Sequence, residues 1–101
     1  MATVSTPVAF RAVARTEFDE AGDWYEARRP GSGASFAAAV QVVLDRIAAQ
    51  PDFYAVAEGD IREAPVRGYP YCVYYREEPG QIIVLAVFHT SRNPAIWRSR
   101  A

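Results

Sequence analysis

Residues 81–89 read Gln-Ile-Ile-Val-Leu-Ala-Val-Phe-His and are apolar at nearly every position. An extended chain points alternate side chains to opposite faces. One face of this segment would carry Ile83, Leu85, Val87 and His89, and the other Ile82, Val84, Ala86 and Phe88. A strand that is apolar on both faces must be covered on both, so we predict that residues 81–89 form a central strand of a sheet.

A second segment, residues 71–76, is equally dense in aromatic and β-branched residues, and Pro79-Gly80 separates it from the first. Proline sets φ for the first corner of a turn and glycine supplies the positive φ of a type II corner, so this pair predicts an antiparallel hairpin. Because a type II turn splays its strands, we expect a loop longer than two residues, reaching into Glu77 and Glu78.

Two further segments read as strands. Residues 61–67 precede the hairpin, and Pro65 places this strand at the sheet edge or turns its own nitrogen toward solvent, because proline cannot donate a ladder hydrogen bond. Residues 6–11 read as a short first strand, in which Val8 and Phe10 point the same way. The chain therefore has one early strand and a three-stranded antiparallel meander at its end.

Between these strands the apolar period changes to three and four residues, which is typical of amphipathic helices. In residues 12–28 the apolar stripe is Ala14, Phe18, Ala21 and Tyr25. The acidic residues of this helix are expected to face outward: Glu17, Asp19, Glu20, Asp23 and Glu26. A second helix is predicted over residues 34–50, with Ser32 as its N-cap and Pro51 after its end. The two helices form an antiparallel hairpin over one face of the sheet.

The end of the chain is expected to fold back on the core. After His89 we predict a loop and one helical turn, in which Asn93 is the cap, Pro94 takes the first position and Trp97 packs on the core. The sequence thus predicts an α+β fold with an N-terminal strand, a helical hairpin and a three-stranded antiparallel meander. At 101 residues it is expected to be a single domain, residues 1–101.

Several features predict a cytoplasmic protein. The single cysteine, Cys72, forms no internal disulfide, fits a reducing compartment and is expected to be a small buried apolar residue. No segment approaches the ~20 apolar residues of a membrane span, so we expect no membrane contact. Arg11 and Arg15 interrupt the apolar part of residues 1–15, which therefore lack the pattern of a signal peptide.

Charge is unevenly divided along the chain. Residues 1–60 hold five arginines and nine acidic residues, whereas residues 61–101 hold six arginines and three acidic residues. All 11 basic residues are arginine, whose fork matches phosphate and carboxylate groups. The basic sheet half fits either a polyanion or acidic peptide surface, or simply a solvated edge.

Several kinds of chemistry are disfavoured. One histidine and one cysteine offer no ligand set for zinc or iron, so we expect no metal site. Gly31-Ser32-Gly33 joins two helices and not a strand and a helix, so we expect no phosphate loop and no cofactor. A hydrolytic triad would need Ser91 to reach His89, but neighbours at a strand end are expected to point apart, and no carboxylate partner is evident.

What remains is a set of cationic residues interleaved with tyrosines along the sheet: Arg62, Arg67, Arg76, His89 and Arg92 with Tyr69, Tyr71, Tyr74 and Tyr75. These residue types suit RNA binding or metal-free RNA cleavage, because guanidinium groups clamp phosphates, histidine moves protons and tyrosines stack on bases. Strand alternation divides the set between two faces, so not all of it can share one site. The alternatives are a strand-end histidine bound to a backbone group and solvated or ion-paired arginines.

A series of short motifs runs through the chain in order: Phe18-Asp19-Glu20-Ala21, Trp24-Tyr25-Glu26-Ala27-Arg28-Arg29-Pro30-Gly31, Arg46-Ile47-Ala48, Pro51-Asp52-Phe53-Tyr54, Ile61-Arg62, Tyr69-Pro70-Tyr71-Cys72-Val73-Tyr74-Tyr75 and Val87-Phe88-His89-Thr90-Ser91-Arg92-Asn93-Pro94. The series resembles the RelE/ParE superfamily of toxins from type II toxin–antitoxin modules over residues 8–97. The resemblance implies a β-α-α-β-β-β fold and a bacterial growth-inhibiting toxin. It also implies a hetero-oligomer with a cognate antitoxin, whose disordered C-terminal segment folds around the toxin.

The resemblance leaves the target open. RelE-like members cut messenger RNA in the ribosomal A site, whereas ParE-like members inhibit DNA gyrase by binding and lack that catalytic set. If the chain is RelE-like, its catalytic residues are Arg67, His89 and Arg92. Where the nucleases tend to carry an arginine, this chain has Tyr71 or Cys72, so we favour a ParE-like target. An interaction module that has lost toxicity is the third hypothesis.

Two surfaces follow as predictions. The target-binding residues are expected to be Arg62, Arg67, Tyr71, Arg76, His89 and Arg92. The antitoxin is expected to lay an acidic and apolar segment over the helical hairpin and along the sheet, with Trp24, Arg28 and Arg29 among its contacts. Trp24 lies one step off the apolar stripe and is either a flank of the core or an exposed anchor for a partner.

Overall fold

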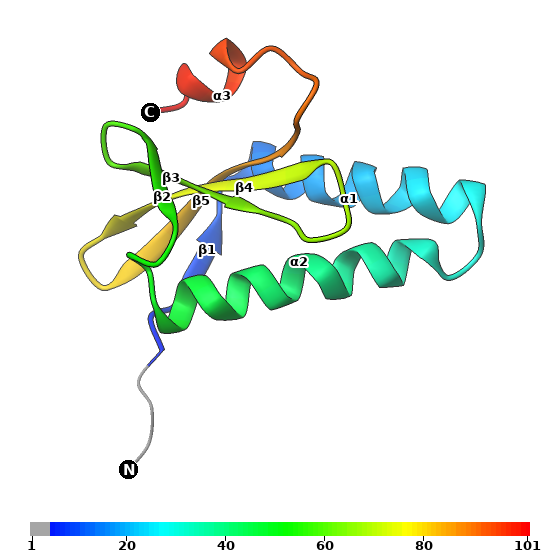
Figure 1. Ribbon diagram of the computed structural model, residues 1–101, viewed down its shortest axis with the longest axis horizontal. Coiled ribbons are helices and arrows are strands. Elements are labelled where there is room, and N and C mark those ends of the chain that lie inside the picture. The colour runs from blue at the N-terminus through cyan, green and yellow to red at the C-terminus, as the bar shows by residue number, and fades with distance from the viewer. Residues whose placement is uncertain (1–4) are drawn as a thin grey trace.

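The structure, a computed structural model, describes residues 5–101. Residues 1–4 lie outside it. The predicted domain, residues 1–101, and the segment tested for a signal peptide, residues 1–15, both begin with these four residues. Its elements in chain order are β1 (Val8–Phe10), α1 (Ala12–Arg28), α2 (Ser32–Ala49), β2 (Ala55–Glu58), β3 (Ile61–Pro65), β4 (Tyr71–Glu78), β5 (Gln81–His89) and α3 (Ala95–Arg98) (Figure 1). The predicted α+β fold is confirmed. Within residues 5–101, no helix is long and apolar enough to cross a bilayer.

The strands form one sheet in the order β1-β5-β4-β3-β2. β1 pairs with β5 in parallel, through Val8 with Ile82 and Phe10 with Val84. The β3-β4 and β4-β5 pairs are antiparallel, as the predicted meander requires. β5 therefore lies between β1 and β4, which confirms residues 81–89 as an inner strand.

β2 is a strand that the sequence analysis did not predict. It pairs with the start of β3, through Ala55 with Glu63 and Val56 with Arg62, and it forms the sheet edge in place of β3. This pairing ends at Glu63, two residues before Pro65. The missing N–H of Pro65 therefore removes no hydrogen bond from the β2-β3 ladder.

The β4-β5 hairpin differs from the sequence prediction in two ways. Glu78 pairs with Gln81, so the loop is the two-residue Pro79-Gly80, and the expected longer loop is wrong. Gly80 has a φ of 76°, which closes the turn within these two residues. The register then shifts between Tyr74 and Tyr75, because they pair with Ala86 and Val84 and leave Leu85 as the extra residue of a β-bulge.

The bulge changes which side chains of β5 share a face. Ile82, Val84 and Val87 lie in the core on the helix side, and Leu85, Ala86 and Phe88 lie in the core on the other side. The strict alternation predicted for this strand is therefore wrong after Val84. His89 nevertheless stays in phase with Val87 and lies against Tyr71, with ring centroids 5.1 Å apart.

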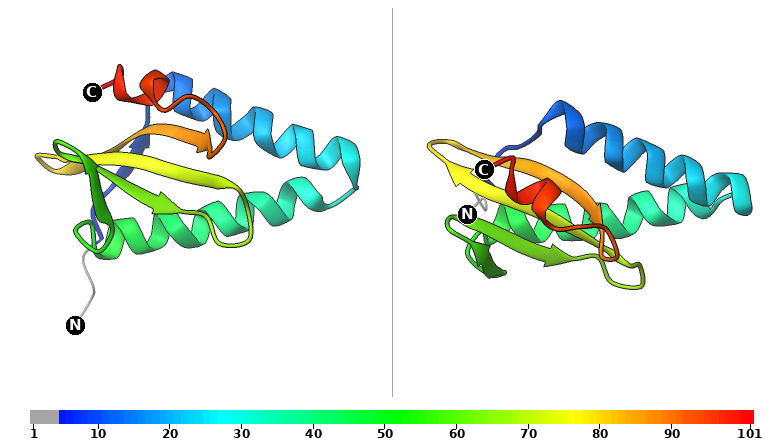
Figure 2. Two further views of the ribbon diagram at one scale, coloured as in Figure 1. Left: turned by 45° about the horizontal axis from the view of Figure 1, so that its top comes forward. Right: turned by 90° about the horizontal axis from the view of Figure 1, so that it is seen from above.

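Each face of the sheet has its own cover. On one side α1 and α2 pack Ala14, Ala21, Phe36 and Val40 against the strands, as the helical-hairpin prediction requires. On the other side α3 covers the sheet (Figure 2). Its Trp97 stacks on Tyr74 with ring centroids 4.0 Å apart. The return of Trp97 to the core is confirmed. The Asn93 side chain accepts a hydrogen bond from the backbone N–H of Ala95, but Pro94, expected as the first helical residue, occupies the cap position, and α3 begins at Ala95.

The turn between α1 and α2 is held by Glu26. Its carboxylate accepts hydrogen bonds from the backbone N–H of Gly31 at 2.9 and 3.0 Å and of Gly33 at 3.0 Å. Ser32 was the expected N-cap, but it is the first residue of α2, and Gly31 occupies the cap position with a φ of 90°. Glu26 thus supplies the acceptor that was expected from Ser32.

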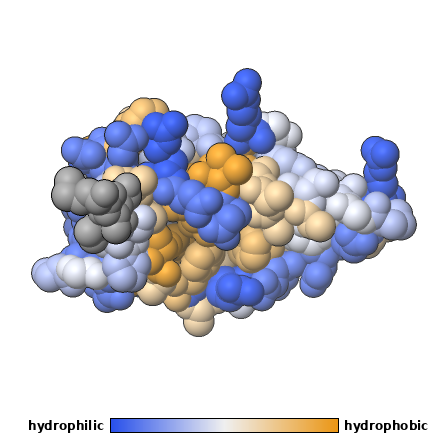
Figure 3. All heavy atoms as spheres, turned by 90° about the horizontal axis from the view of Figure 1, so that it is seen from below, coloured by the Kyte–Doolittle hydropathy of each residue, from blue (hydrophilic) through white to orange (hydrophobic). Residues whose placement is uncertain are grey.

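The outward side of α2 is partly apolar. Seen from below, apolar residues run across the middle of the molecule and hydrophilic residues surround them (Figure 3). Val42 of α2 is 70% exposed, whereas Val40 and Val43 of the same helix are buried. α2 therefore carries apolar side chains toward solvent as well as toward the core.

Candidate functional site

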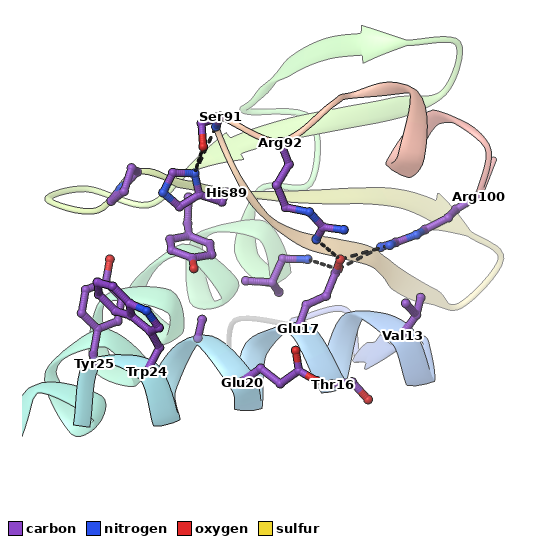
Figure 4. Close-up of a pocket in the computed structure, with 14 residues that line it drawn as sticks. Val13, Thr16, Glu17, Glu20, Trp24, Tyr25, His89, Ser91, Arg92 and Arg100 are labelled. Atoms are coloured by element: carbon purple, nitrogen blue, oxygen red, sulfur yellow. Dashed lines mark hydrogen bonds and ion pairs between the residues drawn. The ribbon is translucent and has the colours of Figure 1, made fainter. Parts of the chain in front are cut away.

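A groove of about 820 Å³ lies between α1 and the C-terminal end of β5, with the chain after β5 along its rim (Figure 4). Its lining residues are Val13, Thr16, Glu17, Glu20, Ala21, Trp24, Tyr25, Pro70, Tyr71, Val87, His89, Ser91, Arg92 and Arg100. The residues of α1 recur at three- and four-residue spacing, which places them on one side of a helix. The groove is thus built from segments far apart in the sequence.

Glu17 is the centre of the polar contacts in this groove. Its Oε2 lies 2.8 Å from Nη1 of Arg92, and its Oε1 lies 2.8 Å from Nη1 of Arg100. Oε1 also accepts a hydrogen bond of 3.1 Å from the backbone N–H of Val87. A single carboxylate therefore joins α1, β5 and the end of the chain.

Glu17 was expected on the outer face of its helix, and this is wrong. The Glu17 side chain is 11% exposed, because the C-terminal segment folds over it and supplies two guanidinium groups. A signal was present in the spacing: Ala14, Glu17, Ala21 and Trp24 fall at intervals of three, four and three. Glu17 thus shares the groove side of the helix with two buried alanines.

The two arginines differ in exposure. Arg100, which the sequence analysis did not single out, is 14% exposed and also donates to the carbonyl oxygen of Leu85 at 3.1 Å. Arg92 is 43% exposed, and its guanidinium carbon lies 4.3 Å from the centre of the Phe88 ring. Arg100 is therefore a structural cation, whereas Arg92 remains open to the groove.

His89 is held by the turn that follows β5. Its Nδ1 accepts the backbone N–H of Ser91 at 3.0 Å, and the Ser91 hydroxyl oxygen lies 2.7 Å from the same atom. Because Nδ1 accepts a hydrogen bond from a backbone N–H, neutral His89 carries its own proton on Nε2. A strand-end histidine bound to a backbone group, one of the two readings of the sequence, is the arrangement found.

The Ser91–His89 contact corrects another expectation. These side chains were expected to point apart, but the chain turns after His89 and brings them together. The carboxylate of Glu17 is engaged by Arg92 and Arg100 and not by His89. Within residues 5–101, no carboxylate hydrogen-bonds to His89, so the geometry lacks the third member of a hydrolytic triad.

The tyrosines of the groove are poor proton donors near neutral pH. Burial raises the pKa of Tyr71 above its usual value, and the neighbouring Tyr25 raises it further against the opposing effect of Arg92. Burial also raises the pKa of Tyr25, with a contribution from Tyr69. These hydroxyl groups therefore stay protonated and serve as hydrogen-bonding and packing groups.

The predicted target-binding residues divide between two places. Tyr71, His89 and Arg92 line the groove together. Arg67 is exposed in the turn between β3 and β4. This turn leads into Tyr71, which pairs with His89, so Arg67 lies at the same end of the sheet as the groove. Arg67 does not line the groove.

The other two arginines of the predicted set lie nearer the hairpin end of the sheet. Arg62 donates to the carbonyl oxygen of Tyr54 at 2.8 Å, in the loop before β2. Arg76 is 17% exposed, and its Nε lies 3.6 Å from Oδ1 of Asp60 in the β2-β3 turn. The structure therefore does not bring the whole cationic set together.

The residues predicted to contact an antitoxin lie along the second half of α1. Trp24 is 50% exposed and lines the groove, so it resembles the exposed anchor more than the flank of the core. The guanidinium carbon of Arg28 lies 3.5 Å from the centre of the Trp24 ring, and Arg29 is exposed at the end of the helix. These residues form a surface continuous with the groove.

No metal centre accompanies these residues in the described part of the chain. Within residues 5–101 there is no group of three or more His, Cys, Asp or Glu side chains placed to hold a metal ion. Cys72 is buried on the opposite face of the sheet, and burial raises the pKa of its thiol to about 11. The polar chemistry of the groove therefore rests on Glu17, His89, Ser91, Arg92 and Arg100.

Comparisons with known proteins agree with this fold. Among solved structures, the chromosomal ParDE toxin–antitoxin system from P. aeruginosa contains a chain with a TM-score of 0.75 and 12% sequence identity, covering 86% of this chain and 98% of that one. A comparison with curated proteins finds no match. The family model described as the ParE toxin of the type II toxin–antitoxin system parDE matches residues 8–94. The chain therefore belongs to the ParE family of toxins from type II toxin–antitoxin systems.

Proposed function

We propose that this chain is a toxin that inhibits bacterial growth by binding DNA gyrase and that a cognate antitoxin neutralises it. The proposal begins from the family match over residues 8–94. The observation that carries the choice of target is the dispersal of the cationic set: Arg62 donates to the carbonyl oxygen of Tyr54, and Arg76 pairs with Asp60, both outside the groove. In an RNA-cleaving site several cations should instead converge to stabilise charge on one phosphate.

The state of His89 also favours binding over catalysis. Its Nδ1 is already occupied by Ser91, and burial raises the pKa of the adjacent Tyr71, which makes that hydroxyl a weaker acid. RNA cleavage by attack of the 2′-hydroxyl needs both an acid and a base close to the phosphate. The groove offers a hydrogen-bonding and apolar surface that suits protein recognition better than this chemistry.

The gyrase-binding surface that we propose is the end of the sheet formed by Arg67, Tyr71, His89 and Arg92. The Pro70 carbonyl oxygen accepts the N–H of Thr90 at 2.9 Å, which joins the β3-β4 turn to the chain after β5. Arg67 adds an exposed charge to that turn. Arg62 and Arg76, which were predicted with this set, are bound elsewhere and have a smaller role in the proposal.

The antitoxin surface that we propose begins at Trp24, Arg28 and Arg29 on α1. An exposed indole ring beside two arginines suits an acidic and apolar segment, because aromatic and arginine side chains dominate many protein interfaces. Replacing both arginines by alanine should weaken antitoxin binding, and unchanged affinity would place the interface elsewhere.

The test is a supercoiling assay with purified gyrase and toxin produced by cell-free synthesis. We expect the toxin to block supercoiling, and normal supercoiling at excess toxin would contradict the proposal. A translation extract provides the parallel assay. Transcripts cut at A-site codons, with cutting abolished by joint replacement of Arg67, His89 and Arg92 by alanine, would instead indicate a ribosome-dependent nuclease. Normal growth of cells that overproduce the chain without antitoxin would indicate an interaction module without toxicity.

A further inference from the structure

The edge of β5 that faces β1 is open over its second half, because β1 pairs with β5 only as far as Val84. Beyond that point side chains complete the backbone hydrogen bonding of β5. Oε1 of Glu17 accepts the N–H of Val87 at 3.1 Å. Nη1 of Arg100 donates to the carbonyl oxygen of Leu85 at 3.1 Å. Glu17 and Arg100 therefore occupy the place that a longer β1 would take.

The carboxylate of Glu17 is held at both of its oxygens. Arg100 donates to Oε1 at 2.8 Å and to Oε2 at 3.0 Å, in addition to the bond from Val87 to Oε1. The Glu17 side chain is 11% exposed and that of Arg100 is 14% exposed, so little solvent competes for these hydrogen bonds. A carboxylate fixed by three donors has a fixed direction for its next contact.

That next contact is Arg92, which converges on Glu17 from the rim of the groove (Figure 4). Its Nη1 lies 2.8 Å from Oε2 of Glu17, and its guanidinium carbon lies 4.3 Å from the centre of the buried Phe88 ring. The Arg92 side chain is 43% exposed, and within residues 5–101 its Nε and Nη2 have no hydrogen-bond partner. One nitrogen and one face of this guanidinium are thus held, and the other two nitrogens are open to solvent.

We propose that Glu17 is a positioning residue of the gyrase-binding surface: it fixes the guanidinium group of Arg92 so that Nε and Nη2 are presented to the target. The inference rests on the proposed function, in which Arg92 contacts gyrase, and it adds a residue that does not itself touch the target. An arginine that is ordered before binding loses less conformational entropy on binding, so the same hydrogen bonds give a higher affinity.

Charge alone predicts the opposite effect of removing Glu17. Within residues 5–101, Glu17 is the only acid paired with Arg92, and it is shared with Arg100. Replacing it by glutamine leaves both guanidinium groups without a counter-charge, which should strengthen the attraction of Arg92 for a hydrogen-bond acceptor of the target. Loss of a fixed orientation should weaken binding instead. The sign of the change therefore separates the two explanations.

The first test is the gyrase supercoiling assay, with each variant shown by circular dichroism to be folded at the assay temperature. For Glu17→Gln we expect the concentration that half-inhibits supercoiling to rise about 10-fold. The matched control is Tyr75→Phe, which removes another long-range hydrogen bond, to the carbonyl oxygen of Pro51, outside the groove. Inhibition should be unchanged in this control. Undiminished inhibition by Glu17→Gln, or an equal loss in Tyr75→Phe, would overturn the proposal.

A double-mutant cycle shows whether Glu17 acts through Arg92. Arg92→Gln should weaken inhibition by about 10-fold or more, because its charge-assisted hydrogen bonds are lost. Adding Glu17→Gln to this variant should cause no further loss, because no guanidinium group remains to be positioned. A second loss of similar size in the double variant would mean that Glu17 acts by another route.

An NMR measurement tests the positioning in the original chain without gyrase, so a poorly folded variant does not leave the question open. The ¹⁵N–{¹H} NOE of an arginine Nε reports motion on the ps–ns timescale. Arg92 should be ordered and Arg67, exposed in the β3-β4 turn, should be mobile. Equal mobility of the two side chains would overturn the proposal. If the original chain leaves supercoiling intact, the proposed target is wrong, whereas this comparison still decides whether Glu17 holds Arg92.

Discussion

Two glutamates of α1, Glu17 in its first half and Glu26 in its second, each accept several hydrogen bonds. Their partners lie at very different distances along the sequence. Glu26 binds the backbone N–H groups of Gly31 and Gly33, only five and seven residues later. Glu17 binds Val87, Arg92 and Arg100, which lie 70 to 83 residues later. One carboxylate closes a local turn, and the other holds together the two ends of the chain.

The difference lies in what each contact depends on. The Glu26 contact uses backbone groups that the adjacent turn always presents, so it forms as soon as the two helices meet. The Glu17 contact requires the sheet and the C-terminal segment to be in place first, and it removes most of Glu17 and Arg100 from solvent. The groove proposed to be functional is lined by Glu17 and its distant partners Arg92 and Arg100, so its shape depends on the long-range contact.

The largest expected effect comes from breaking the long-range contact with Glu17→Ala. This change leaves two arginines and the N–H of Val87 without their acceptor, in a region where Glu17 is 11% and Arg100 14% exposed. We expect the free energy of unfolding to fall by about 3 kcal/mol, as for other broken, largely buried ion pairs. Chemical denaturation followed by circular dichroism measures it.

Glu20→Ala is the control for this prediction. Glu20 lies one turn further along the same helix and is exposed, so its removal should change the free energy of unfolding by less than about 0.5 kcal/mol. Equal effects of the two substitutions would mean that the contact of Glu17 with distant residues does not contribute to stability.

The next prediction tests the local end of α1 through a pair of glycines. A Cβ on Gly33 would lie 2.8 Å from the backbone oxygen of Gly22, whereas a Cβ on Gly22 would meet no atom within 4 Å. Gly33→Ala should therefore cost about 2 kcal/mol by pushing the helices apart. Gly22→Ala should instead stabilise the protein by up to about 1 kcal/mol, because alanine favours a helix. Thermal denaturation of both variants gives the comparison, and a stabilised Gly33→Ala variant would contradict the close helix packing.

A hydrogen bond of Tyr75 tests the effect of a long-range contact without the effect of charge. The Tyr75 hydroxyl donates to the carbonyl oxygen of Pro51 at 2.6 Å, across 24 residues and without an ion pair. Tyr75→Phe should cost about 1 to 2 kcal/mol, because a half-buried acceptor loses its donor. An unchanged free energy of unfolding would mean that solvent replaces the lost donor.

The same tyrosine predicts a dependence on alkaline pH. Burial raises the pKa of Tyr75 to about 12, although nearby Arg62 lowers it. An unfolded tyrosine titrates near pH ~10, so the folded state holds this proton more tightly. The contribution to stability is therefore complete below pH ~10 and is lost as the pH rises toward ~12. Between pH 9 and 12, the free energy of unfolding should fall less steeply with rising pH in Tyr75→Phe than in the original chain.

The sequence predicted what local patterns determine. The period of the apolar residues located α1 from residue 12 to residue 28, and Pro79-Gly80 located the hairpin turn. β2 was missed because its four residues are mostly exposed and show no buried alternating pattern. The bulge at Leu85 was missed because a fully apolar strand gives no sign of where its register shifts.

The groove was predicted only in part, for a related reason. His89, Arg92 and Tyr71 were identified from residue type, because cations and aromatic rings at strand ends suggest binding. Glu17 and Arg100 were not, since their roles depend on the last residues of the chain folding back over α1. Helical spacing placed Glu17 on the same side of the helix as Ala14 and Ala21. A partly buried carboxylate on that side is not expected until its two partners, Arg92 and Arg100, are known.

The smallest expected effect tests the local contact alone. In Glu26→Gln the amide oxygen still accepts one hydrogen bond, but the amide nitrogen cannot accept the others that Gly31 and Gly33 now donate. Glu26 is exposed, so we expect a loss of only about 0.5 to 1 kcal/mol in the free energy of unfolding. Hydrogen exchange at the amides of Gly31 and Gly33 should quicken while exchange at Val87 stays unchanged. Faster exchange at Val87 as well would show that the two ends of α1 are coupled, and the distinction between a local and a long-range glutamate would then fail.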